Sequence, residues 1–278
     1  MQATIEQIKE TFASFSKEAL ISIEKIPQSG SIRIYYRILT ATKSFIATYG
    51  INIKENEAFI YFSRHFTSCD CPVPAIFAVH RSGTIYIQED FGDISLLDKL
   101  EEHGHNSYVY AFFEQSLKQL AHLQIKGDKN LDYSFCITSK EFGKQAIISD
   151  LLYFKYYFLD ALQIPYDKEK MLDDFEKLSD YLSHADHKYF MFRDFQSRNI
   201  LIRDEKVHFI DYQGGMKGAL QYDVASMLWQ AKANLSDEWK NNLLDYYMDC
   251  VEETINEKID RAHFINQYNG YVLIRLMQ

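Results

Sequence analysis

The sequence predicts an α+β protein with two lobes, because strand patterns and helix patterns fall in different parts of the chain. Short apolar runs typical of strands dominate the first third, and patterns with helical spacing dominate after Ser95. The chain has 278 residues, of which 47% are hydrophobic and 15% aromatic, so it is able to bury a large core. We place one lobe at residues 1–88 and a second, helical lobe at residues 89–278.

The first lobe is expected to contain two helices and several strands. Ile5, Ile8, Phe12 and Phe15 recur on one face of an N-terminal helix, and 55–66 also has helical spacing. Strands are predicted at 21–26, 32–38, 44–49, 76–79 and 84–88.

The second lobe is expected to be mostly helical, with helices at 107–125, 142–163, 167–183, 219–232, 235–256 and 260–277. The aromatic run 153–158 lies within one of these helices, and its spacing predicts that it is mainly core. The pattern near the end stays apolar up to Gln278 without a Gly, Pro or polar tail, so we expect the native chain to continue.

Charge and composition exclude several classes of protein. A net charge of −9 argues against nucleic acid or an anionic membrane as the main partner, since both require a basic face. No apolar run is long enough to span a bilayer, and the N-terminus lacks the pattern of a signal peptide. Cys69, Cys71, Cys136 and Cys250 show neither metal spacing nor a disulfide framework. We therefore expect a cytoplasmic protein with reduced thiols.

The segment 191–199, together with Asp211, carries the clearest chemical pattern. Asp194 lies five residues before Asn199, and two apolar runs joined by a polar turn, within 200–210, predict a β-hairpin before Asp211. A hairpin returns the chain to its start, so Asn199 and Asp211 are expected to lie side by side. Amide and carboxylate oxygens are hard ligands, which Mg²⁺ prefers when it also binds phosphate. Asp194 is then placed to accept a hydrogen bond from a substrate hydroxyl, which indicates phosphoryl transfer.

At these residues the chain resembles the protein-kinase-like superfamily, and more closely its branch of aminoglycoside phosphotransferases and choline kinases. The resemblance implies a bilobal fold with an antiparallel sheet in the N-terminal lobe and a mostly helical C-terminal lobe. It implies that Asp194 is the catalytic aspartate, that Asn199 and Asp211 bind Mg²⁺, and that ATP is the phosphate donor. The family usually has His two residues before the catalytic Asp. Phe192 stands there instead, so apolar packing must replace a lost hydrogen bond.

A possible phosphate-covering loop lies between the first two strands, where Gly30 permits close approach of an anion and Ser29 and Ser31 supply donors. An ordinary hairpin turn is the alternative. The next strand resembles that of the anomeric kinases of N-acetylmuramate and N-acetylglucosamine, which has a Ser-aromatic-Arg start and a Tyr-aromatic-Arg end. The resemblance implies that Arg33 or Arg37 contacts nucleotide phosphate. Otherwise both are solvated strand residues.

The strand 44–49 lacks the Lys that protein kinases pair with phosphates and with a Glu of the next helix. Arg37 is the expected replacement, and Lys43 and Lys54 are weaker candidates. Glu57 begins the helix where the family's Glu would be, although the helix dipole also explains an acidic residue there.

The resemblance also implies an adenine site at the hinge residues Gln88, Glu89 and Asp90, whose backbone would bind the base. On the acceptor side it implies that Asp150 meets hydroxyl groups and that Tyr153, with the further tyrosine Tyr157, stacks on the substrate ring.

Two residues of the catalytic loop, Gln196 and Arg198, are also assigned to the acceptor site. Asp223 follows Tyr222 at the start of a helix, a pair typical of the family. We expect a structural role for Asp223, either capping backbone N–H groups or holding the catalytic loop.

Together these patterns predict an ATP- and Mg²⁺-dependent small-molecule kinase, acting on a hydroxyl of a sugar or amino sugar. An aminoglycoside or choline-type kinase is one alternative, and it would need an acidic pocket for a cationic acceptor. A pseudokinase or nucleotide-binding regulatory module is another, suggested by Phe192 and the missing strand Lys.

Overall fold

The first lobe is built around an antiparallel sheet. The structure is a computed structural model that describes residues 2–27 and 32–278. Within these ranges the sheet has five strands in the order β1-β2-β3-β5-β4. The strands are β1 (Leu20–Lys25), β2 (Ile34–Thr40), β3 (Ser44–Tyr49), β4 (Ile76–Val79) and β5 (Ile85–Glu89).

Helix α1 (Gln2–Ala13) covers one face of this sheet and forms a small separate core with it. Ile8 and Phe12 are fully buried or nearly so, and Ile5 and Phe15 pack partly buried at the edge. The predicted apolar face of the N-terminal helix is therefore confirmed.

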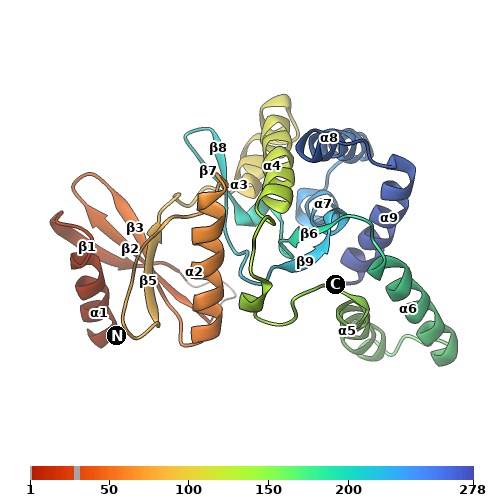
Figure 1. Ribbon diagram of the computed structural model, residues 1–278, viewed down its shortest axis with the longest axis horizontal. Coiled ribbons are helices and arrows are strands. Elements are labelled where there is room, and N and C mark those ends of the chain that lie inside the picture. The colour runs from red at the N-terminus through yellow and green to blue at the C-terminus, as the bar shows by residue number, and fades with distance from the viewer. Residues whose placement is uncertain (1, 28–31) are drawn as a thin grey trace.

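Helix α2 (Ile53–Ser68) joins the two lobes, and Figure 1 shows it between the sheet and the helical part of the molecule. It begins at Asn52, whose side chain accepts a hydrogen bond from the backbone N–H of Glu55. Phe62 and Phe66 are fully buried in the large core of the helical lobe. The hydrophobic core thus extends across the predicted lobe boundary, because α2 packs against both lobes.

The second lobe is mostly helical, which confirms the α+β, kinase-like bilobal fold (Figure 1). None of the described helices has the length and apolar character needed to cross a membrane. The helices are α3 (Leu96–His103), α4 (Ser107–Lys126), α5 (Lys144–Phe154), α6 (Lys168–Ser183), α7 (Leu220–Leu228), α8 (Asp237–Ile255) and α9 (Arg261–Met277), and the short strands are β6 (Lys188–Met191), β7 (Ile200–Arg203), β8 (Lys206–Phe209) and β9 (Met216–Ala219).

Two of these elements were not expected from the sequence. Helix α3 has only eight residues, and it begins at a capping box between Ser95 and Asp98. Strand β9 pairs with β6, and its four residues contain a glycine that weakens the strand pattern.

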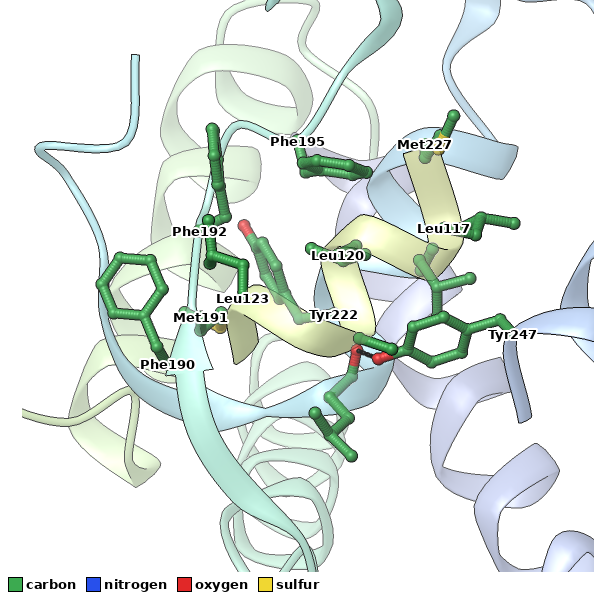
Figure 2. Close-up of a cluster of buried hydrophobic side chains, with 14 of the residues drawn as sticks. Leu117, Leu120, Leu123, Phe190, Met191, Phe192, Phe195, Tyr222, Met227 and Tyr247 are labelled. Atoms are coloured by element: carbon green, nitrogen blue, oxygen red, sulfur yellow. Dashed lines mark hydrogen bonds between the residues drawn. The ribbon is translucent and has the colours of Figure 1, made fainter. Parts of the chain in front are cut away.

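The core beneath β6 supports the segment that follows it. Leu117, Leu120 and Leu123 lie on one face of α4 and are fully buried. Figure 2 shows this face packed against Phe192 and Phe195, with Tyr222 and Tyr247 closing the cluster from α7 and α8. The segment that follows β6 is therefore packed against a layer of buried apolar side chains.

The predicted burial of the aromatic run 153–158 is wrong. Helix α5 ends at Phe154 and continues as a π-helical turn (Lys155–Asp160). Tyr153, Tyr156, Tyr157 and Phe158 are 52%, 57%, 69% and 47% exposed. The reason is that α5 lies at the edge of the lobe and buries Ile147 and Leu151, whereas the wider π turn changes the spacing of the residues beyond them.

Candidate active site

A cavity of about 810 Å³ lies between the two lobes, a volume within the range of small-molecule sites. Ile26 and Ile46 of the first lobe and Leu201 and Ile210 of the helical lobe give it apolar walls. The remaining lining is largely polar and includes Arg33, Arg37, Glu55, Gln88, Glu89, Asp90, Arg198, Asn199, Asp211 and Gln213. The apolar walls suit the flat face of a nucleotide base, and the polar groups between them suit its charged phosphates.

The catalytic-loop residues are held by a tight turn after β6. The backbone carbonyl of Asp194 accepts hydrogen bonds from Gln196 N and from Asn199 Nδ2, both at 2.9 Å. Asn199 N donates to Gln196 O at 2.8 Å, which closes a short 3-10 turn (Ser197–Asn199). The side chain of Asp194 is exposed, and that of Asn199 lines the cavity. The two residues are therefore fixed on one loop.

The β7–β8 hairpin brings Asn199 and Asp211 together, as predicted. Ile200 pairs with Phe209, and Ile210 N donates to Asn199 O at 3.0 Å. Asn199 and Asp211 therefore flank the open end of the hairpin, and both line the cavity.

Asp211 adopts a φ of +72°, an unusual conformation for a residue other than glycine. Its carboxylate accepts a hydrogen bond from Gln213 Nε2 at 2.7 Å and lies 3.4 Å from Arg33 Nη2. Gln213 was missed in the sequence, and its position two residues after Asp211 is the only pattern that could have indicated it.

This donor set fits Mg²⁺ that is shared with phosphate oxygens. The amide nitrogen of Asn199 is occupied by the carbonyl of Asp194, so its amide oxygen remains available beside the Asp211 carboxylate. Among the described residues no group of three or more His, Cys, Asp or Glu side chains could hold a metal. One carboxylate and one amide suit Mg²⁺, which usually keeps substrate phosphates and waters as its other ligands.

Phe192 is fully buried at the position of the family's His. Its ring lies edge-on to Phe195, Phe209 and Tyr212, with centroid distances of 5.3, 6.2 and 5.8 Å. Figure 2 shows Phe192 and Phe195 above the leucines of α4. Apolar packing thus replaces the missing hydrogen bond, as expected.

Asp223 is fully buried and holds the backbone of the loop that follows β6. Its carboxylate accepts hydrogen bonds from the backbone N–H groups of Phe192 at 2.7 Å and Arg193 at 3.0 Å, and from Gln124 Nε2 at 2.9 Å. Burial raises the pKa of Asp223 to about 7, although these three donors oppose the shift. Of the two expected arrangements, the structure shows the one in which Asp223 holds the catalytic loop.

Asp150 does not present a free carboxylate to an acceptor, contrary to expectation. It forms a two-pronged ion pair with Arg193, at 2.9 and 3.3 Å, and also accepts a hydrogen bond from Gln278. The backbone of Arg193 has a φ of +79°, and its guanidinium lies over the ring of Phe142 and outside the cavity lining. The helix α5 is thereby tied to the residue next to Asp194.

Tyr153 and Tyr157 form the exposed pair that was assigned to the substrate ring. Their rings stack on one another with a centroid distance of 4.3 Å and an interplanar angle of 28°. They lie outside the cavity lining.

Arg37, the phosphate cation that the sequence favoured, is bound by two carboxylates in the structure. Its guanidinium forms ion pairs at 2.7 Å with both Asp90 and Asp93, so it ties β2 to the hinge. Glu57 is not the helix glutamate, because its side chain is exposed. Glu55, two residues earlier in the same helix, faces inward instead, and its Oε1 lies 3.2 Å from Arg33 Nε. Neither arginine is a solvated strand residue.

The hinge residues Gln88, Glu89 and Asp90 line the cavity where an adenine was expected. The carboxylate of Asp90 accepts a hydrogen bond from Gly92 N at 2.9 Å. The backbone carbonyl oxygen of Asp90 accepts a second one from Arg203 Nη1 at 2.5 Å. The hinge is therefore fixed from both lobes. The residues of the predicted phosphate-covering loop, Ser29, Gly30 and Ser31, lie outside the described residues.

Arg198 and Gln196 lie on the catalytic loop, on either side of Ser197. Arg198 is exposed and lines the cavity, and it has no hydrogen-bond or ion-pair partner among the residues that the structure describes. Ser197 itself is anchored, since its N–H and hydroxyl both donate to Gln230 Oε1, at 3.0 and 2.7 Å. Gln230 had no sequence pattern that could have revealed it.

The bilobal fold and the loop-and-hairpin site define a small-molecule phosphotransferase with a protein-kinase-like architecture. A family model described as "Phosphotransferase enzyme family" matches residues 27–254, so the chain belongs to the phosphotransferase enzyme family. A search of curated proteins gave no match.

Solved structures show the same fold at low sequence identity. A choline kinase from Cryptosporidium parvum Iowa II is 14% identical with a TM-score of 0.67, covering 99% of this chain and 87% of that one. A choline/ethanolamine kinase family protein from Mesorhizobium loti is 13% identical with a TM-score of 0.65, covering 100% and 83%. An aminoglycoside phosphotransferase from Streptomyces rimosus is 14% identical with a TM-score of 0.59, covering 99% and 97%.

Proposed function

We propose that the protein transfers the terminal phosphoryl group of ATP to a hydroxyl group of a small molecule, with Mg²⁺ as the metal ion. The observation that carries this proposal is that Asn199 and Asp211 line one interlobe cavity side by side, with Asp194 held next to Asn199 on the same loop. The two oxygen ligands would hold Mg²⁺, which neutralises phosphate charge when bound. Asp194 lies on the same loop, with its side chain exposed to an acceptor.

In the reaction, Asp194 orients the acceptor hydroxyl and takes its proton as the new O–P bond forms. The bond between the γ-phosphorus and the bridging oxygen breaks at the same centre, and ADP leaves. Asn199 Nδ2 holds the backbone of Asp194 at 2.9 Å, which keeps the base and the metal ligand in fixed relation.

The nucleotide is expected to place its base against the hinge residues Gln88 to Asp90, between the apolar walls. Its phosphates then lie near Arg33 and Arg198, the cavity cations that remain once Arg37 is bound to the hinge carboxylates. An ADP-bound aminoglycoside phosphotransferase, 14% identical with a TM-score of 0.61, has the same fold and is compatible with this placement.

For the acceptor we propose a neutral or acidic amino sugar, phosphorylated at its anomeric hydroxyl. Arg193 and Arg198 flank the catalytic loop, and the carboxylate of Asp150 is neutralised by Arg193. A cationic acceptor would meet the positive charge of Arg198, with Asp194 as its main counter-charge on the loop. The exposed pair Tyr153 and Tyr157 offers ring faces of the kind that sugars stack against.

A cationic acceptor is the second candidate, and one observation favours it. Exposed tyrosine faces also bind quaternary ammonium groups, and several proteins of this fold are named choline or ethanolamine kinases. A nucleotide-binding module without transfer activity is the third possibility, since Phe192 and the strand without Lys depart from the family pattern.

Incubation with radiolabelled ATP, Mg²⁺ and a panel of acceptors separates these candidates. We expect label in N-acetylglucosamine or N-acetylmuramate, with loss of the sugar's reducing end, and none in choline or an aminoglycoside. Label only in choline or an aminoglycoside would replace the sugar proposal with the cationic one. Binding of ATP without transfer to any acceptor would favour the regulatory module.

A further inference from the structure

The third strand of the sheet, β3, has a threonine at the place where a lysine would serve a nucleotide. Thr48 is fully buried and stands opposite Tyr86 of β5 and Tyr35 of β2 in the register of the sheet. Its short side chain carries no charge. In the protein-kinase fold a lysine of this strand joins the nucleotide phosphates to a glutamate of the following helix.

The guanidinium of Arg33 reaches the same region from the chain that enters β2. Its Nη1 donates to the hydroxyl of Tyr86 at 3.4 Å, and Tyr86 is the register partner of Thr48. Its Nε lies 3.2 Å from Glu55 Oε1 on α2. A cation from the segment that enters β2 therefore contacts both the register partner of Thr48 and the helix glutamate.

Arg33 also contacts the proposed metal aspartate, because its Nη2 lies 3.4 Å from Asp211 Oδ1. Charge-assisted hydrogen bonds are usually shorter, about 2.7–2.9 Å. The pair is thus loose enough for the carboxylate to bind a metal and for the guanidinium to bind phosphate. The side chain of Arg33 is only 6% exposed, and it lines the cavity.

Gly50 makes room for this arrangement. A Cβ atom at this position would lie 2.5 Å from Asn56 Oδ1 and 3.2 Å from Arg33 Cγ. A larger residue after β3 would therefore push against the stem of Arg33.

We propose that the phosphate-binding cation of this enzyme has moved from β3 to the entrance of β2, so that Arg33 links nucleotide phosphate, Glu55 and Asp211 while Thr48 fills the vacated position. This inference rests on the proposed binding of Mg-ATP. It assigns one function to the contacts with Glu55 and Asp211, which would otherwise only neutralise a buried arginine.

The inference is tested by moving the positive charge from position 33 to position 48. Binding of a fluorescent ATP analogue with Mg²⁺ is measured for the wild type, Arg33→Ala, Thr48→Lys and the double variant Arg33→Ala/Thr48→Lys. Arg33→Ala should weaken binding about 10- to 100-fold, as expected for the loss of charge-assisted hydrogen bonds. The double variant should recover at least about tenfold of this loss, since Lys at position 48 returns the charge to the same region.

Thr48→Lys alone completes the double-mutant cycle, because it shows the effect of the added charge while Arg33 is in place. Arg81→Ala is the matched control, since Arg81 is an exposed arginine of the same lobe, and its binding should be unchanged. Thermal unfolding is followed in parallel. If Arg33→Ala does not fold, Arg33→Lys takes its place. This variant is expected to bind the ATP analogue more weakly than the wild type, but more tightly than the double variant Glu55→Gln/Arg33→Lys.

Unchanged affinity in Arg33→Ala overturns the inference. A folded double variant that binds no better than Arg33→Ala also overturns it. Because binding is measured without an acceptor, these results are independent of whether any acceptor is phosphorylated. Absence of Mg-ATP binding in the wild type would instead contradict the proposed function itself.

Discussion

The side-chain amide of Asn199 donates a hydrogen bond to the backbone carbonyl of Asp194 at 2.9 Å. This single bond ties the proposed metal ligand to the residue that carries the proposed base. The same loop is anchored from below by Asp223 and from the side by Gln230. The structure therefore holds the loop by several hydrogen bonds and leaves the carboxylate of Asp194 exposed.

Asp211→Asn should abolish the dependence of nucleotide binding on Mg²⁺, because the carboxylate charge that attracts the metal is removed while the shape is kept. We expect only a small change in thermal stability, since the side chain of Asp211 is 43% exposed. A Mg²⁺ titration of nucleotide binding measures the effect. Asp204→Asn at the exposed tip of the hairpin is the control and should behave as the wild type. An unaltered Mg²⁺ dependence in Asp211→Asn would remove Asp211 from the metal site.

Asp194→Asn should leave nucleotide affinity nearly unchanged and lower kcat by about two to four orders of magnitude, the usual cost of losing a general base. Among the residues that the structure describes, the side chain makes no hydrogen bond within the loop, because the loop's bonds use the backbone carbonyl of Asp194. Steady-state kinetics with measured ATP affinity separate the two effects. Turnover comparable to the wild type would show that another group activates the acceptor.

Asp223→Asn should change how stability depends on pH. Burial raises the pKa of Asp223 from 3.8 to about 7, so the folded protein binds this proton more tightly than the unfolded chain does. The stabilisation is complete below the unfolded value and is lost as pH rises through about 7. Denaturant unfolding from pH 4 to 8 should therefore show a falling component in the wild type that the variant lacks. Parallel profiles of the two proteins would contradict the raised pKa.

Phe192→His should not raise activity above that of the wild type, although it introduces the residue that the family usually has. An imidazole among Phe195, Phe209 and Tyr212 would be buried with apolar rings around it. Burial of an unpaired polar group costs about 1–3 kcal/mol of unfolding free energy. Phe192→Leu is the control, and it should cost less because it stays apolar. Higher kcat together with equal stability in Phe192→His would show that the apolar packing is not a replacement.

Asp93→Asn distinguishes the two functions considered for Arg37. If Arg37 ties β2 to the hinge, loss of this partner should loosen the hinge and raise the KM for ATP about two- to fivefold, as for a partly exposed ion pair. If Arg37 binds phosphate, the same change frees its guanidinium and should lower the KM. The sign of the change in KM decides between them.

The sequence predicted the parts of the structure that depend on local patterns. The hairpin at 200–210 could be predicted because its apolar runs and polar turn lie next to each other in the chain, and it fixed the expected proximity of Asn199 and Asp211. The partners of Arg33 and Arg37 could not be predicted. Arg33 lies just before β2 and Arg37 lies within it, and their different partners, Glu55 and Asp90, are set by how α2 and the hinge pack against the sheet.

Long-range packing also explains why Asp150 and the aromatic run were misjudged. The acidic and aromatic residues around Asp150 in its helix suggested a contact with the substrate. Its actual partner, Arg193, is 43 residues away in sequence, so local patterns could not reveal the ion pair. The exposure of Tyr156 and Tyr157 depends on a π-helical turn, and helical spacing calculated for an α-helix cannot predict it.

The central claim is that Asp194, Asn199 and Asp211 form the active site of an ATP-dependent small-molecule kinase. Its most direct test is the transfer of label from radiolabelled ATP to the acceptor panel by the wild type and by Asp194→Asn, with both proteins first shown to bind Mg-ATP. The account predicts Mg²⁺-dependent labelling of a hydroxyl-bearing acceptor by the wild type and a loss of at least about a hundredfold in the variant. Equal labelling by the two proteins, or Mg-ATP binding by the wild type without labelling of any acceptor, would contradict it.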